Sequence, residues 1–370
     1  LQRGCCLMLR THISFVVTLL ITSAGIFGQS YSNGYSTLIL MRSASAREAG
    51  MSGAYSASVN EPNAVFINPA ALPGQAERPV VSSTAALLGL SRSITRLCVA
   101  YDLSENVGAG IGLLYFNGGE FTRTDASGNT LGTARYATYV VQAGLGITIA
   151  SASFGASAKA IQSYVSGEDI RGNGYAFDVG ARIPFAKNFL LGMSALNIGS
   201  ITWNNSITGR DPLPWSLRTG ISTEISHTDK QSQVRKGSLG KLDTIITPSA
   251  TYMLLSLEGT VARGARIPTI TVGTEVAVSE LLAVRGGLAL IAEDSGQIVY
   301  LPSRGVAGGV SYRFIADELP FQLSVDYAVS SSLLSPGGLN HVVSLTAALD
   351  RKSTRLNSSH VSESRMPSSA

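Results

Sequence analysis

The chain has 370 residues, of which only 14% are charged and 39 are glycine; this is too little charge to cover soluble domains of that total length. Its net charge of +4 comes from the two ends, because residues 1–28 and 350–370 carry six basic and two acidic side chains and leave 22 of each sign between them. That balance gives no support to a nucleic-acid partner. No run of eighteen apolar residues follows residue 28, which excludes helical membrane spans.

Residues 1–28 are predicted to be a short upstream piece followed by a signal peptide. The stretch from Met8 has a basic residue near its start, an apolar run from Ile13 to Ile21 and small residues after it, as signal peptides do. Cleavage after Ala24 or Gly28 would suit this pattern. A transmembrane helix is the alternative, but the apolar run is too short to cross about 30 Å of hydrocarbon.

Residues 29–78 lack the strand pattern of the rest. The stretch "SASAREAGMSGAYSAS" (43–58) has helical periodicity, and "NAVFINPAAL" (63–72) is too polar and kinked for a strand. Closely spaced Ala, Gly and Met suit a short helix packed tightly against a wall, Pro69 ends that packing, and Asn68 can satisfy backbone groups at a turn. An ordinary loop before the first strand is the alternative.

Residues 79–349 repeat an alternation with period two, which is typical of strands that have one apolar face. In "FQLSVDYAV" (321–329) the odd-numbered residues are apolar and the even-numbered ones are polar or small. Fourteen such segments of about ten residues predict an all-β fold, a transmembrane antiparallel β-barrel of about 14 strands. They lie at 79–90, 94–102, 107–117, 135–149, 152–164, 174–184, 188–198, 214–225, 248–260, 268–278, 281–290, 305–314, 319–330 and 340–349.

The connections between these segments alternate in length, as the periplasmic turns and extracellular loops of outer-membrane barrels do. Two connections break the alternation, because 91–93 is short and 226–247 is long. A secreted β-sandwich is the alternative, but its outer faces would carry more charge. We therefore expect the chain in the bacterial cell outer membrane, surrounded by its lipid. The long connections are predicted at 118–134, 165–173, 199–213, 291–304 and 331–339.

If the apolar face meets lipid, the polar face lines the lumen. Both signs of charge occur on it in near balance, whereas a strongly ion-selective pore would show one sign dominating. The lumen is therefore expected to hold something inside it. The predicted lumen-facing charges are Lys159, Asp178, Arg182, Arg218, Glu224, Glu275, Arg285, Arg313 and Asp326.

Residues 350–370, "DRKSTRLNSSHVSESRMPSSA", break abruptly from the strand pattern. Read back into codons, they resemble a translated sequencing-library adapter, and a disordered basic tail is the alternative. A scar of this kind has no part in the fold. We expect the natural chain to be cut near Leu349.

The order of several motifs resembles the PorV/PorQ family, outer-membrane barrels related to the FadL-type transporters. The shared pieces are "AR-AGM-GAY" from Ala46, "NPAAL" (68–72), "FDVGARIPF…LLGMSALNIGS", "LPWSLRTGIS", "AVRGGLAL" and "NHVVSLTAAL", and they cover nearly the whole mature chain. The aromatic residue that usually ends the family's last strand is not seen before Leu349. The resemblance implies that part of residues 29–78 folds inward as a small helical plug, with the motif residues Arg47, Gly50, Met51, Gly53, Asn68, Pro69 and Ala70.

Two functions follow as expectations. The resemblance implies a role in type IX secretion, with secretion-system components and exported cargo proteins as partners. The alternative is a FadL-like channel for the uptake of hydrophobic small molecules. Such a channel requires an apolar pocket at the loop end of the barrel, and a strand kink at Gly or Pro beside the plug would favour it.

The sequence does not indicate an enzyme. Only His227 and His341 lie within residues 29–349, and neither a Ser–His–Asp arrangement nor metal-ligand spacing can be built from them. "GAGIG" (108–112) resembles a phosphate-binding loop but lies within a strand, so it is interpreted as small residues that pack on the two faces of the wall. We expect no catalytic residues, no cofactor, no metal and no nucleic acid.

Overall fold

A computed structural model describes ten stretches of the chain. They are residues 37–74, 79–167, 169–186, 188–204, 209–236, 242–263, 268–290, 305–314, 321–331 and 339–349; of 226–250, 321 and 349, only the backbone is considered. The predicted signal peptide and the predicted adapter-derived tail lie outside the described residues.

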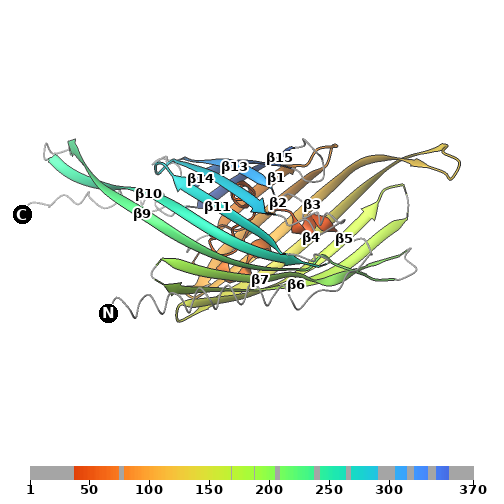
Figure 1. The fold of residues 1–370 in the computed structure, drawn as a ribbon, viewed down its shortest axis with the longest axis horizontal. Coiled ribbons are helices and arrows are strands. Elements are labelled where there is room, and N and C mark those ends of the chain that lie inside the picture. Colours follow the sequence, from red (N-terminus) through yellow and green to blue (C-terminus); the bar gives the residue numbers. More distant parts are fainter. Residues whose placement is uncertain are drawn as a thin grey trace, which may run out of the picture.

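Fourteen strands form the wall of a closed antiparallel barrel, as predicted (Figure 1). Each wall strand pairs with its neighbours along the chain, and the last strand pairs with the first, so the sheet has no free edge. The wall strands are β1 (Val80–Leu87), β2 (Ser93–Ser104), β3 (Val107–Thr124), β4 (Thr130–Ile149), β5 (Ala152–Val165), β6 (Ile170–Ala186), β7 (Phe189–Trp203), β9 (Ser216–Lys236), β10 (Leu242–Ala262), β11 (Thr269–Ala277), β12 (Leu282–Leu290), β13 (Val306–Phe314), β14 (Phe321–Ser331) and β15 (Leu339–Leu349). A two-residue strand, β8 (Asp211–Pro212), pairs only with β7.

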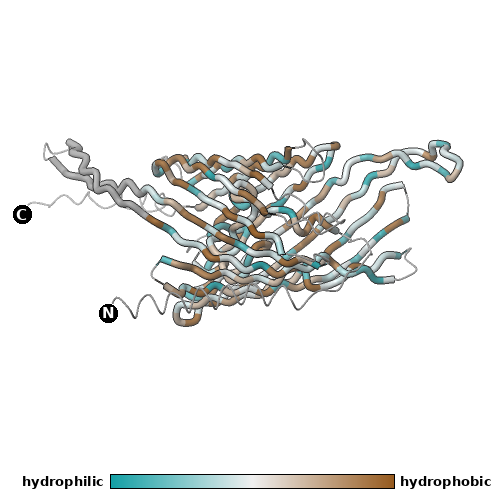
Figure 2. Tube along the Cα trace, viewed as in Figure 1, coloured by the Kyte–Doolittle hydropathy of each residue, from teal (hydrophilic) through white to brown (hydrophobic). Residues whose placement is uncertain are grey.

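Hydrophobic and hydrophilic residues alternate along the wall strands (Figure 2), and the side chains exposed on the outer face are mostly apolar. Along β4 the side chains alternate, with Thr138, Val140 and Gln142 buried and Tyr139, Val141 and Ala143 exposed. Exposed leucine, valine and isoleucine side chains recur in the same way around the barrel, which suits lipid and would not suit water. No helix in the described stretches combines the length and apolar character needed to cross a membrane.

Outward-facing aromatic side chains mark the two edges of this apolar band. Tyr139 stacks on Tyr115 and Tyr164, with ring centroids 4.9 and 6.0 Å apart, and Phe154 lies opposite Ile147, eight residues further along β4. Eight residues span about 26 Å along a strand, or roughly 20 Å of height once the strand tilts. This is close to the apolar height of an outer-membrane barrel, whose aromatic girdles lie at the two interfaces.

Two hairpins extend past the wall at opposite ends of the barrel (Figure 1). The stretch 118–134 was predicted as a loop, but most of it continues β3 and β4, with Phe121 opposite Ala134. The stretch 226–247 was predicted as a long connection, and it continues β9 and β10 until Lys236 pairs with Leu242. Beyond the lipid neither face of a hairpin needs to be apolar, so the alternation disappears while the backbone pairing continues.

The amino-terminal helices lie inside the barrel as a plug, which confirms the predicted fold class. They are η1 (Leu38–Met41), α2 (Ala46–Gly50), α3 (Ala64–Ile67) and η2 (Pro69–Ala71). Helix α2 contacts β12 to β15, α3 contacts β3 and β4, and η2 contacts β4 to β6, so the plug reaches opposite sides of the lumen. "Plug" hereafter means residues 37–74.

Candidate functional site

The stretch "NPA" (68–70) forms a corner at the end of the plug that lies away from the loop ends of the strands. Asn68 is extended and fully buried, and its Oδ1 accepts a hydrogen bond from the Ala70 backbone N–H at 3.1 Å. Its Nδ2 donates to the Ser56 carbonyl at 3.0 Å and to the Ala181 carbonyl of β6 at 3.3 Å. Pro69 opens η2 at a position where a missing N–H costs nothing. One asparagine therefore caps a helix and ties the plug to the wall.

Glycines on the inner wall let the plug backbone approach closely. A Cβ on Gly155 would overlap the Pro69 carbonyl group, and a Cβ on Gly192 would overlap the Ala57 backbone. The glycines of "GAGIG" also allow the plug to approach the wall closely, because Gly108 faces Leu72 and Gly112 faces Phe66. It is therefore a packing surface, as interpreted from the sequence.

On one side of the lumen, a buried arginine joins the plug to two wall strands. Arg218 of β9 bonds Glu258 of β10 through Nε at 2.6 Å and Glu48 of α2 through Nη1 at 2.9 Å. Its Nη2 donates to the Gly53 carbonyl at 2.7 Å. Glu258 also accepts from the Tyr55 backbone N–H at 3.1 Å. Each of the three guanidinium nitrogens donates to an acceptor, and such bonds compensate for holding these charges out of water.

A second cluster joins α2 to β11, β12 and β14. Arg47 makes a two-point contact with Glu275, at 2.5 and 2.7 Å, and Tyr252 donates to the same carboxylate at 2.5 Å. Arg285 also bonds Glu275, and its Nη1 lies 2.8 Å from Asp326. The cluster alternates in sign, so each charge has an opposite neighbour.

A third cluster fills a bulge in β7. Asn197 has φ 61°, a left-handed conformation that asparagine tolerates better than most residues, and the β6–β7 register shifts there. Asp178 of β6 accepts from the Asn197 backbone N–H at 2.7 Å and lies 2.9 Å from Lys159. Gln142 bonds both Asp178 and the Val65 carbonyl of the plug. The wall therefore carries a kink beside the plug, at an asparagine and not at the Gly or Pro considered from the sequence.

Most of the predicted lumen-facing charges are buried against the plug or in the clusters, and two are exposed. Lys159, Asp178, Arg218, Glu275, Arg285 and Asp326 are buried in the three clusters, and Arg182 donates to the Ala57 carbonyl of the plug at 3.1 Å. Glu224 and Arg313 are exposed and belong to none of the clusters, so their predicted lumen-facing position stays a prediction. Both alternate in step with the inward-facing residues of their strands, but they lie towards the strand ends. The alternation of a strand shows which face a residue is on and not how far along the barrel it lies.

The plug-motif residues all lie in tight contacts. Met51 is buried against Gly273 and Gly287, and Gly50 packs on Gly309. Gly53 adopts φ 90°, a conformation that favours glycine, and presents its carbonyl to Arg218. Their part in any function stays a prediction.

Sequence reasoning missed Glu48, Glu258 and Arg96. Glu258 and Arg96 have the inward parity of their strands, so the alternation could have found them. Glu48 lies in a helix of five residues, where no strand parity applies.

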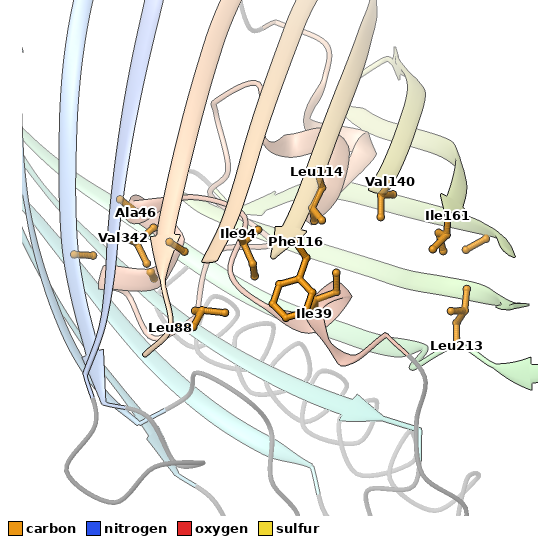
Figure 3. Packing of buried hydrophobic residues seen from close by; sticks show 14 of the residues in the cluster. Ile39, Ala46, Leu88, Ile94, Leu114, Phe116, Val140, Ile161, Leu213 and Val342 are labelled. Carbon is orange, nitrogen blue, oxygen red and sulfur yellow. The ribbon is translucent and has the colours of Figure 1, made fainter. Parts of the chain in front are cut away.

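Towards the loop end of the strands, buried apolar side chains line the inner face of the wall (Figure 3). Leu114 and Phe116 of β3 point inward against Ile39 of the plug, and partly buried Tyr136 and Trp203 pack on the same cluster. We call the wall part of this cluster the apolar collar: Ala86, Leu88, Ile94, Leu114, Phe116, Val140, Ile161, Ala176, Ile201, Leu213, Ala328 and Val342. An aqueous pore is polar inside, so this surface suits an apolar solute.

Glu61 of the plug is the acidic group most affected by burial. Its carboxyl accepts a hydrogen bond from the Ser45 hydroxyl. Burial raises the pKa of Glu61 to about 7, and the nearby Asp326 adds to the rise, while Ser45, Arg47 and Arg285 oppose it. A proton on Glu61 thus removes an excess negative charge beside the second cluster, that of Arg47, Glu275, Arg285 and Asp326. Within the described stretches, no three His, Cys, Asp or Glu side chains are grouped as a metal site.

Comparison with known proteins gives a fold. No protein-family model matches the chain, and no curated protein sequence matches it. The CymD monoaromatic hydrocarbon channel has a TM-score of 0.50 at 13% identity, over 86% of this chain and 99% of that one. The deltaS2 mutant of the TodX monoaromatic hydrocarbon channel has the same score and identity, over 83% and 98%.

The wall therefore has the same fold as these two channels. A further solved structure, a Pseudomonas aeruginosa FadL homologue, has a TM-score of 0.46 at 10% identity, over 84% of this chain and 98% of that one. The closed barrel with its apolar band confirms the predicted location in the bacterial outer membrane.

Proposed function

We propose that the barrel admits small hydrophobic compounds across the outer membrane. The observation that carries this proposal is the apolar collar, since buried leucine, isoleucine, valine and phenylalanine side chains face the lumen where a water-filled pore would be polar. Apolar pockets with aromatic walls are the usual binding sites of such solutes. Two of the structures similar in fold are named as monoaromatic hydrocarbon channels, and compounds of that size are the solutes we propose.

The kink in β7 supports the same function. At Asn197 the strand leaves its pairing with β9, and its continuation pairs only with the short β8 on that side. A strand that changes partner beside the plug is a weak point in the wall, because fewer backbone hydrogen bonds hold it there. An apolar solute that leaves the collar through the wall would meet lipid and not water.

Uptake by whole cells tests the proposal. Cells that carry the barrel should take up radiolabelled toluene faster than cells without it, and Leu114→Asp should reduce this gain at least about tenfold, because a carboxylate in the collar disfavours an apolar solute. Thr122→Asp is the matched control. It adds the same charge to the same strand, but at an exposed position beyond the collar. Equal uptake by both variants would contradict the proposal, and heat-modifiable gel mobility checks that both are folded.

A second candidate is the type IX secretion role that the PorV/PorQ resemblance implies. The observation that favours it is the plug itself, because "AREAGMSGAY" and "NPAAL" supply Arg47, Gly53 and Asn68, three of the residues that fix the plug in the lumen. Secretion-system components and exported cargo proteins would then be the partners. Crosslinking in a native host, followed by mass spectrometry, tests this role. Recovery of lipids and neighbouring barrels without any secreted protein would count against it.

A further inference from the structure

Three arginines, Arg42, Arg92 and Arg96, lie near one another, and Glu48 is the acidic residue near Arg96. Arg96 of β2 is 2% exposed and donates to the carbonyls of Ser43 and Arg42, at 2.7 and 3.1 Å. Burial lowers the pKa of Arg42 to about 10, and the charges of Arg92 and Arg96 add to the effect. The contacts of Arg96 are therefore with carbonyl groups, which do not cancel its charge.

Two of these side chains have buried N–H groups that find no acceptor in the described part of the chain. They are Nη1 of Arg42 and Nε of Arg96. Both residues line a cavity of about 30 Å³ between the plug and strands β2, β3, β7 and β9. A buried donor without a partner destabilises the folded protein, so a cavity with two such donors is a place where a ligand atom is expected.

The acidic group nearest to this cavity is already engaged. Among the described residues Glu48 is the only acid that lines it, and Glu48 accepts from Arg218 through one oxygen and from the Ala44 backbone N–H through the other. Arg218, which also lines the cavity, is satisfied by Glu48 and Glu258. The charges of Arg42 and Arg96 therefore have no carboxylate of their own among the described residues that line the cavity.

We propose that Arg42 and Arg96 form a binding site for an oxyanion, such as a carboxylate, sulfonate or phosphate group. A guanidinium prefers planar oxyanion partners, which accept from two N–H groups at once. The volume, close to that of one water molecule in the liquid, admits a single charged group and excludes a whole hydrocarbon. This site goes beyond the proposed passage of neutral solutes and does not depend on it.

The oxyanion can be free or can be the head of an amphiphile. Leu114 lines both the cavity and the collar, and Leu40 and Phe66 line the cavity and pack against the collar cluster. An alkyl chain attached to the anion would therefore continue directly into apolar surroundings. Both sources share the same chemistry at the arginines.

Calorimetric titration of the full chain in lipid nanodiscs tests the site, with empty nanodiscs as the blank. The probes are methanesulfonate, which is the charged head alone, octane-1-sulfonate, which adds an apolar tail, and 1-octanol, which has the tail without the charge. We expect Arg42→Gln to weaken sulfonate binding about tenfold, the effect of losing one charge-assisted hydrogen bond. Arg171→Gln, an exposed arginine at the loop end, is the matched control and should bind as the wild type does.

The outcomes separate the two sources. Equal affinity for both sulfonates assigns the site to a free oxyanion, and much tighter binding of octane-1-sulfonate assigns it to an amphiphile. Arg96→Gln should weaken binding further, and if that variant does not fold, Arg42→Gln alone decides. The site is refuted if Arg42→Gln binds both sulfonates as tightly as the wild type, or if 1-octanol binds as well as octane-1-sulfonate.

Discussion

At the scale of single residues, Arg218 is the ion-pair residue on which the plug depends most. It holds Glu48 of the plug and Glu258 of the wall, and all three side chains are buried. Removing one partner of such a group leaves charges buried without compensation, and this destabilises a protein by about 3–5 kcal/mol. We expect Arg218→Met to lower the free energy of unfolding by that amount in a urea titration in lipid vesicles.

The matched control for this variant is Arg313→Met. Arg313 has the same inward parity but is exposed, so its replacement should change the free energy of unfolding by less than about 0.5 kcal/mol. If the two variants lose the same stability, Arg218 does not hold the plug.

Glu61 gives the plug a pH dependence of definite sign. Its pKa rises from 4.5 to about 7 on folding, so the folded protein keeps a proton that the unfolded chain releases between these values. The stability contributed by protonated Glu61 is therefore complete below pH 4.5, falls as pH rises towards 7, and stays lost above it. The full change is on the order of 3 kcal/mol.

Glu61→Gln isolates this effect, because glutamine keeps a similar shape and does not titrate. Melting temperatures of both proteins, measured from pH 4.5 to 8, should converge at low pH and separate as pH rises, with the variant the more stable. Parallel curves at every pH would show that Glu61 carries no proton in the folded protein.

At the scale of elements, the wall and the plug fit through the inner glycines. The Cβ of Gly155→Ala would overlap the Pro69 backbone, whereas a Cβ on Gly286 would meet only Thr274, at 3.9 Å. Overpacking of a tight contact costs about 1–3 kcal/mol. We expect Gly155→Ala to displace the lower plug and raise ion conductance in planar bilayers, and Gly286→Ala to leave it unchanged. Unchanged conductance in both would mean that the plug does not seal the lumen at η2.

The elements also show what a sequence of this kind can reveal. Alternation located all fourteen strands because lipid demands an apolar face from each of them. It failed at 118–134 and 226–247, where the strands leave the lipid. For Glu224 and Arg313 it indicated a face of the wall but not a position along the strand. The contacts of Glu48 with Arg218 and of Asn68 with β6 join residues more than one hundred positions apart, and a single sequence has no local signal for such pairs.

At the scale of the whole molecule, the barrel combines two linings. Away from the loop end the lumen is lined by charged side chains and filled by the plug. Towards the loop end it is lined by the apolar collar, and Trp203 packs against the collar. The central claim is that this collar binds small hydrophobic compounds. The chain has two tryptophans, so replacing Trp215 by phenylalanine leaves Trp203 as a single fluorescent reporter beside the collar.

Quenching of Trp203 by 4-nitrotoluene, in nanodiscs that hold the Trp215→Phe protein, tests that claim most directly. The account predicts saturable quenching, at least about tenfold weaker when Leu114→Asp is added, because the collar then presents a charge to an apolar ligand. Adding Thr122→Asp instead should leave the curve unchanged. Quenching that rises linearly without saturation, and equally in all three proteins, would mean that the compound reaches Trp203 only from the lipid and that the collar is not a binding site.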